Sequence, residues 1–111
     1  MDVTATLSLG DPLEPARKAT AQMLQERERT FSLPQPFYSD ERLFDIDMQE
    51  IFQKEWLIAG MTCEIPTKGN YITLQIGKNP IIVIRGADGV VHAFHNVCRH
   101  RGSRLCTSDK G

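Results

Sequence analysis

The sequence predicts an α+β chain, in which amino-terminal helices precede an incomplete antiparallel β domain. Apolar residues recur at three- and four-residue spacing in the first half, and the period changes to two after Trp56. Segments rich in Ile, Val and Thr then alternate with turns that contain glycine. The chain has 111 residues, enough for one small domain. Its 41% hydrophobic and 24% charged residues exclude a collagen-like or wholly disordered protein.

Charge and hydropathy limit the partners and the compartment. Thirteen basic and fourteen acidic side chains give a net charge of -1, so charge does not point to nucleic acid or an anionic membrane. The longest apolar run, Ile81–Ile84, is too short to span a membrane, and the amino terminus does not resemble a signal peptide. Three cysteines without a secretory signal argue against a disulfide framework. We therefore expect a cytoplasmic protein with no nucleic-acid or membrane partner.

The first predicted unit, residues 1–45, is a helical and extended lead-in. Residues 1–11 are expected to form a loose tail. The apolar spacing predicts an amphipathic helix over residues 15–29. Two prolines within residues 33–36 end this helix, and residues 37–38 are expected to be extended.

The second predicted unit, residues 46–111, opens with a short helix over residues 47–55. Asp47 and Glu50 have the spacing of a capping box at its start. This helix would place four large residues on one face: Met48, Ile51, Phe52 and Trp56. We interpret the aromatic residues of this set, together with Phe44, as core packing and not as a ligand cage.

Four strands are expected after the helices. They are residues 56–61, 70–76, 80–85 and 90–97. Turns are predicted at Gly77–Pro80 and Ala87–Gly89, where turn-forming residues gather. Cys63, beside the first strand, is interpreted as a small buried hydrophobic residue. The sheet is expected to be unfinished, because no segment after the last strand is predicted to return to it.

The chemistry is concentrated in the loop after the last predicted strand. Cys98 and His100 are two residues apart, so a thiolate and an imidazole can face a common site. The same spacing also fits a hairpin end with a buried cysteine and a solvated histidine. A glycine and three arginines, Arg99, Arg101 and Arg104, crowd this loop, and their positive charge favours an anionic guest such as an iron–sulfur cluster with bound thiolates.

Other histidines and cysteines are weaker candidates. His92 and His95 fall on opposite faces of one strand, so they cannot both join a site there. Cys106 is interpreted as structural or free.

In order and spacing, residues 56–105 resemble the start of the Rieske domain in the α subunits of Rieske-type non-haem iron oxygenases. The matching segments are Trp56–Gly60, Gly69–Tyr71, Ile82–Arg85, Asp88–Phe94 and Asn96–Gly102. Within that family, the chain is most similar to the branch of glycine betaine and choline monooxygenases.

The resemblance implies that Cys98 and His100 are the first cysteine and first histidine ligands of a Rieske [2Fe–2S] cluster. In such a cluster two cysteines hold one iron and two histidines hold the other. The second half of the family motif, Cys-x-x-His, is expected near position 118, so we interpret the chain as an amino-terminal fragment, inactive by itself, that lacks the catalytic domain. Arg99 and Arg101 would neutralise the cluster or donate hydrogen bonds to its sulfides, although they also fit the description of solvated loop charges.

The resemblance also implies the chemistry of the complete protein. It would be an oxidoreductase with a mononuclear Fe(II) in a two-histidine, one-carboxylate site. A flavin/iron–sulfur reductase would supply electrons from NAD(P)H, and O₂ would oxidise a small organic substrate such as a quaternary ammonium compound, by N-demethylation. A homo-oligomer is expected.

Three other interpretations stay open at this point. The first is the α subunit of an aromatic-ring-hydroxylating dioxygenase, and the second is a stand-alone Rieske ferredoxin. The third is a zinc module with Cys98, His100, Cys106 and a fourth ligand such as His95.

Overall fold

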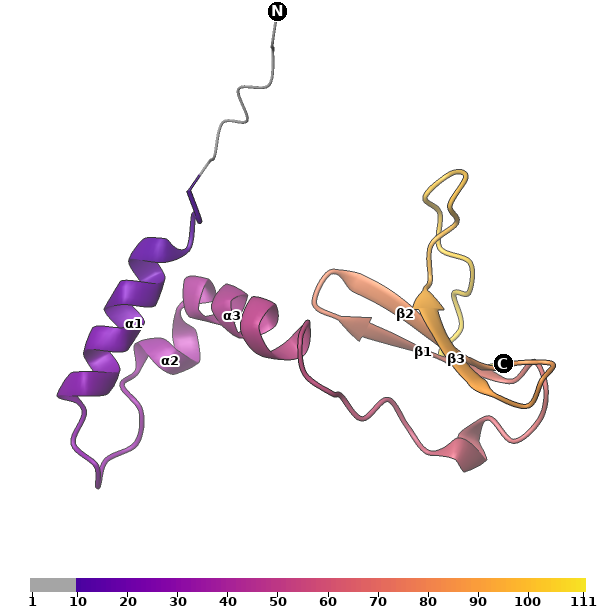
Figure 1. Ribbon diagram of the computed structural model, residues 1–111, viewed down its shortest axis with the longest axis horizontal. Coiled ribbons are helices and arrows are strands. Elements are labelled where there is room, and N and C mark those ends of the chain that lie inside the picture. The colour runs from indigo at the N-terminus through magenta and orange to yellow at the C-terminus, as the bar shows by residue number, and fades with distance from the viewer. Residues whose placement is uncertain (1–9) are drawn as a thin grey trace, which may run out of the picture. The chain divides into compact units, whose positions relative to one another are not determined.

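The computed structural model describes residues 10–111, which form two compact units, one ending at Glu55 and the other beginning at Trp56 (Figure 1). Helices come first and an antiparallel sheet follows, which confirms the predicted fold class. The tail expected at residues 1–11 lies mostly outside the described residues. The elements of the first unit are α1 (Glu14–Glu26), α2 (Pro36–Ser39), α3 (Glu41–Asp47) and the π-helical turn η1 (Met48–Phe52). Those of the second unit are the 3-10 turn η2 (Thr62–Glu64), β1 (Tyr71–Ile76), β2 (Asn79–Arg85) and β3 (Val91–His95).

Helix α1 confirms the helix predicted over residues 15–29, although it ends at Glu26. Its amino-terminal end is held by Asp11, whose carboxylate accepts the Leu13 N–H at 2.9 Å. The other carboxylate oxygen of Asp11 lies 2.7 Å from Arg17 Nε. Asp11 therefore takes up an otherwise unpaired amide at this helix end and also binds a side chain one turn into the helix.

Two predictions in the following segment are wrong. Residues 37–38 are helical, not extended, because Pro36 occupies the first turn of α2, where its fixed φ suits a helix and its missing N–H costs nothing. The next helix is capped by Asp40, whose Oδ1 accepts the Arg42 N–H at 2.9 Å. Asp47 makes no side-chain cap bond, because it already lies at the end of this helix.

The helical unit is held together by one arginine and a small apolar contact. Arg17 of α1 donates from Nη2 to Gln49 Oε1 at 3.0 Å and lies 2.9 Å from a Glu50 carboxylate oxygen. The buried apolar residues of this unit, within the described range, are Leu13, Ala16 and Leu43.

The aromatic residues interpreted as core are exposed instead. The exposed fractions are 58% for Phe44, 43% for Phe52 and 100% for Trp56. The helices of the first unit bury few residues against one another, so they leave Phe44 and Phe52 exposed.

The sheet has the order β1-β2-β3, and both pairs are antiparallel. Tyr71 pairs with Ile84, and Arg85 pairs with Val91. Both predicted turns are confirmed by these hairpins, and Gly89, in the second, adopts a φ of 78°. The centre of the core is a cluster of three buried residues: Ile65, Ile72 and Val83.

The strand predicted over residues 56–61 is wrong. Within residues 10–111 this segment joins no ladder and has no strand partner. Cys63 lies in η2 and is exposed, so its interpretation as a buried residue is also wrong.

The expectation that no segment returns to the sheet is wrong as well. Residues 109–111 run along the outer edge of β1, where Ile72 and Lys110 form an antiparallel bridge. The Thr73 N–H donates to the Asp109 carbonyl at 2.8 Å. An open strand edge offers unpaired N–H and C=O groups, and this short segment satisfies some of them.

No helix within residues 10–111 has both the length and the apolar character required to cross a membrane.

Candidate metal centre

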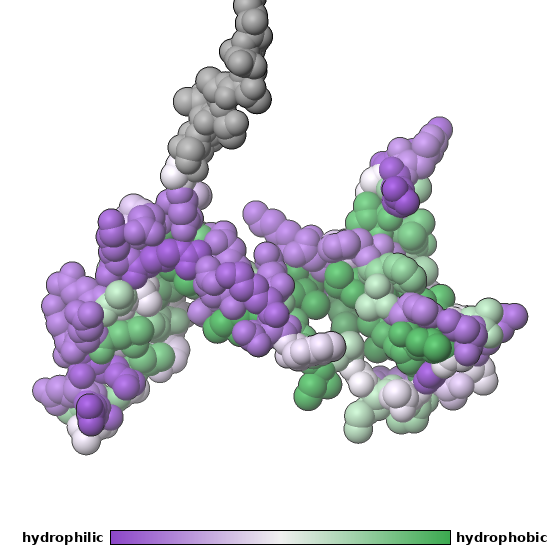
Figure 2. Space-filling view, in the orientation of Figure 1, coloured by the Kyte–Doolittle hydropathy of each residue, from purple (hydrophilic) through white to green (hydrophobic). Residues whose placement is uncertain are grey.

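Cys98 and His100, the two predicted metal ligands, lie on one loop of the β unit. We call residues 97–105 the ligand loop. It follows β3 and rises from the end of that strand before the chain turns back toward β1 (Figure 1). The tip of this projection is hydrophilic, whereas apolar residues gather at its base (Figure 2).

Backbone hydrogen bonds close the ligand loop on itself. The Cys98 N–H donates to the Ser103 carbonyl at 2.7 Å, and the Gly102 N–H donates to the Cys98 carbonyl at 2.8 Å. Gly102 has a φ of 69°, a left-handed conformation that favours glycine. The resulting turn carries Arg99, His100 and Arg101.

The geometry of this turn acts on the Cys98 thiol. The backbone N–H of Arg101, and then that of His100, lowers the pKa of Cys98, although burial opposes this effect. Hydrogen bonds to sulfur favour the thiolate, which is the form that binds metal ions. Cys98 is half-buried, whereas His100 is exposed.

The arginines of the loop differ in their surroundings. Arg104 donates from Nη2 to Gln75 Oε1 of β1 at 3.1 Å. Arg99 and Arg101 are exposed, and neither forms an ion pair with any residue between 10 and 111. Arg101 therefore acts on the Cys98 thiol through its backbone N–H, and this lowering of the Cys98 pKa does not depend on the charge of the Arg101 side chain.

Asn96 is a site residue to which the sequence analysis gave no role. It is a buried polar residue with an exposed fraction of 2%. Its Nδ2 donates to the Cys106 carbonyl at 2.7 Å, and its Oδ1 accepts the Cys106 N–H at 2.9 Å. The signal in the sequence was an amide residue near the end of the predicted strand over residues 90–97, two positions before the candidate thiolate.

The weaker candidates have other partners. His92 Nε2 lies 3.1 Å from Asp88 Oδ2, and the His92 ring stacks on Phe94 with a centroid distance of 6.0 Å. His95 is exposed and Cys106 is a free, half-buried cysteine. In the described part of the chain, no three His, Cys, Asp or Glu side chains are grouped so that they could hold a metal ion. The four-ligand zinc site therefore does not form among these residues.

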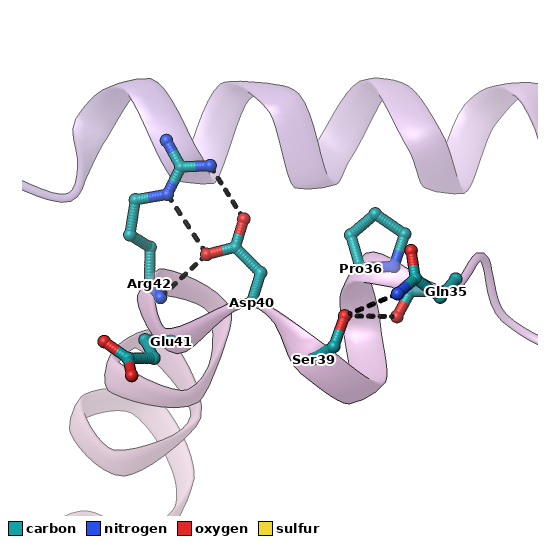
Figure 3. A pocket seen from close by; sticks show the side chains of 6 residues that line it. All are labelled: Gln35, Pro36, Ser39, Asp40, Glu41 and Arg42. Atoms are coloured by element: carbon teal, nitrogen blue, oxygen red, sulfur yellow. Dashed lines mark hydrogen bonds and ion pairs between the residues drawn. The ribbon is translucent and has the colours of Figure 1, made fainter.

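A pocket of about 510 Å³ lies in the helical unit, not at the ligand loop (Figure 3). Its polar side chains pair with one another: Arg42 Nη2 lies 2.7 Å from Asp40 Oδ2, and Gln35 Nε2 donates to Ser39 Oγ at 3.0 Å. The Arg42 side chain lowers the pKa of Asp40, which stays charged in this pair. These contacts stabilise the helix ends.

Comparisons with known proteins agree with the chemistry of the ligand loop. The Rieske [2Fe–2S] domain family matches residues 55–111. The glycine betaine monooxygenase oxygenase subunit of Pseudomonas aeruginosa is 82% identical over 111 residues, which is all of this chain and 26% of that protein. The chain thus spans about a quarter of the length of this curated relative.

Solved structures of oxygenases share the fold. A quaternary ammonium Rieske monooxygenase, CntA, has a TM-score of 0.68 and 36% identity, over 72% of this chain and 23% of that one. A naphthalene 1,2-dioxygenase from Rhodococcus has a TM-score of 0.76 and 26% identity, over 88% of this chain and 22% of that one.

The donor set of the loop fits half of a Rieske cluster. Such a cluster takes two thiolates on one iron and two imidazoles on the other. Cys98 and His100 supply one donor of each kind, and the lowered pKa of Cys98 favours the charged form that iron requires. The Cys-x-His loop lies at the end of a three-stranded antiparallel sheet. Both the loop and the sheet lie within residues 55–111, the segment that the family matches. This chain therefore belongs to the Rieske [2Fe–2S] domain family.

Proposed function

We propose that this chain is part of the oxygenase component of a Rieske non-haem iron monooxygenase that N-demethylates glycine betaine or a similar quaternary amine. The observation that carries the proposal is the 82% identity with a glycine betaine monooxygenase oxygenase subunit, which extends over both units of the chain. A likeness confined to the β unit would support an electron carrier equally well, whereas the helical unit is shared with the oxygenase.

In this proposal Cys98 and His100 are ligands of the [2Fe–2S] cluster, one for each iron. When bound, the cluster supplies one-electron transfer. The N–H groups of Arg101 and His100 lower the pKa of Cys98 and so favour its thiolate, and His100, two residues along the closed turn, is exposed. The guanidinium groups of Arg99 and Arg101, which form no ion pair with residues 10–111, are then available to offset the negative charge of the thiolate-bound cluster.

The overall reaction is balanced by O₂ and an external reductant. One methyl C–H bond of the substrate becomes C–OH, the second oxygen atom leaves as water, and two electrons and two protons are consumed. NAD(P)H supplies the electrons through a flavin/iron–sulfur reductase, and the O₂ chemistry belongs to a mononuclear Fe(II) site that we assign to no residue of this chain. The C–N bond of the hydroxylated product then breaks, the nitrogen keeps the electron pair, and formaldehyde, a tertiary amine and the hydroxyl proton are released. A cytoplasmic homo-oligomer is part of the same proposal.

The second candidate function is aromatic-ring hydroxylation. The similarity to naphthalene 1,2-dioxygenase extends over 88% of this chain, so the same ligand loop fits either reaction. Sequence identity favours the first candidate, because it is 82% with the glycine betaine monooxygenase oxygenase subunit and 26% with the Rhodococcus naphthalene 1,2-dioxygenase.

The test uses the complete oxygenase with its reductase. With glycine betaine, NAD(P)H and O₂, we expect formaldehyde and NAD(P)H consumption in a ratio near one to one. NAD(P)H oxidation without formaldehyde, together with a cis-diol from an aromatic acid, would transfer the protein to the ring-hydroxylating class.

A further inference from the structure

We propose that Asn96 is a positioning residue for the metal centre, because its side-chain amide clamps the base of the ligand loop. The inference rests on the proposed role of Cys98 and His100 as cluster ligands. It assigns to Asn96 no contact with the cluster itself.

The clamp consists of two hydrogen bonds between one side chain and one peptide position. Asn96 Nδ2 donates to the Cys106 carbonyl at 2.7 Å, while the Cys106 N–H donates to Asn96 Oδ1 at 2.9 Å. The pair resembles a hydrogen-bonded bridge between antiparallel strands, with the side-chain amide in the place of a peptide group. It joins the two ends of the nine-residue loop, 97–105, that carries both proposed ligands.

The backbone of Asn96 fixes this clamp to the sheet. Its N–H donates to the Pro80 carbonyl of β2 at 2.8 Å, one position beyond the pair formed by Ile81 and His95. The side chain is 2% exposed, so water does not compete for its hydrogen bonds. Asn96 therefore connects the ordered end of the sheet to the far end of the loop.

An amide is the group that this position requires. It carries a donor and an acceptor, whereas a carboxylate carries acceptors alone and an apolar side chain carries neither. Asn96→Asp keeps the shape and the acceptor for the Cys106 N–H but directs an oxygen at the Cys106 carbonyl. Asn96→Leu leaves both groups of Cys106 without a partner, which is costly in a buried place. Either change would release the base of the loop while Cys98 and His100 remain in the sequence.

The experiment compares both variants with wild type in the complete protein. Changes beyond the first ligand shell typically weaken metal binding about 10- to 100-fold, and we expect cluster loss to a chelator to accelerate by a factor in this range. We also expect a shifted reduction potential and faster hydrogen exchange at the Cys106 amide. Asn70→Ala is the matched control, because Asn70 Oδ1 also accepts two hydrogen bonds, from the N–H and Oγ1 of Thr67, in the same unit but before β1.

The outcomes separate this inference from the proposed function. A wild-type protein without a Rieske electron paramagnetic resonance signal contradicts the proposed function. If the wild type gives the signal but Asn96→Asp leaves the cluster lifetime and the reduction potential unchanged, the clamp is overturned. It is also overturned if Asn70→Ala changes these two quantities as much as Asn96→Asp does. If both Asn96 variants fail to fold, hydrogen exchange at the Cys106 amide of the wild type is the test. Slow exchange at this amide supports the clamp, and exchange at the rate of a free peptide overturns it.

Discussion

Tyr71 and Gly111 are joined by two backbone hydrogen bonds. The Tyr71 N–H donates to the Gly111 carbonyl at 2.8 Å, and the Gly111 N–H donates to the Tyr71 carbonyl at 3.1 Å. They bring the segment after the ligand loop back to the sheet, on the edge of β1 that does not face β2. The ligand loop is therefore an excursion between two segments that are both tied to the sheet.

Hydrogen exchange tests this pairing. The amides of Tyr71 and Thr73 donate to residues 111 and 109, so we expect both to exchange slowly. Gln75 is the internal control, because it lies two positions further along the same strand, at the same edge and beyond the reach of residues 109–111. Two-dimensional NMR of the protein in D₂O measures all three amides. Equal exchange rates at Thr73 and Gln75 would contradict the pairing.

Cys98→Ser and His100→Ala test the proposed ligands in the complete oxygenase. Each change removes a donor to iron, so we expect the Rieske electron paramagnetic resonance signal and turnover to fall to background. Cys63→Ser is the matched control, because Cys63 is also a free cysteine of the β unit but is exposed and lies in η2. Normal cluster absorbance and turnover in either ligand variant would show that the assignment is wrong.

Gly102→Ala tests the backbone of the ligand loop. Gly102 has a φ of 69°, and a Cβ atom there would meet no atom within 4 Å, so the expected cost comes from backbone strain alone. That strain is about 1–2 kcal/mol for a residue in the left-handed region. Denaturant unfolding measures the loss. Equal stability of Gly102→Ala and the wild type would argue against the turn.

From the surroundings of the Asp88 carboxyl we expect acid to destabilise the β2–β3 hairpin. The N–H of Val90, and then His92, lowers the pKa of Asp88 below its ordinary value of 3.8. Because the pKa of Asp88 is lower in the folded hairpin, its charged form stabilises the fold. This stabilisation is complete at a pH above the unfolded-state pKa of about 3.9, and it is lost as the pH falls through the folded-state pKa. Carboxyl-carbon NMR should therefore show Asp88 titrating below 3.8. In His92→Gln we expect the pKa to rise in part and to stay depressed by the Val90 N–H; an unchanged pKa would exclude a contribution from His92.

The sequence alone determined the features that depend on local chemistry. The apolar period predicted α1, and alternation with glycine turns predicted the two hairpins, because helix and strand periodicities and left-handed turn positions are properties of short segments. The Cys98-x-His100 spacing was visible for the same reason, and the segments around it sufficed to indicate the family.

The tertiary structure decided what depends on residues distant in the chain. Residues 56–61 have the composition of a strand but no partner strand within residues 10–111, whereas residues 109–111 have little strand character and pair with β1 because its edge is open. The aromatic residues Phe44 and Phe52 have the character of a core, yet no element of their own unit, among residues 10–55, buries them. Asn96 became a clamp only when residue 106 returned beside it, because a buried amide is stable where a second peptide satisfies both its donor and its acceptor.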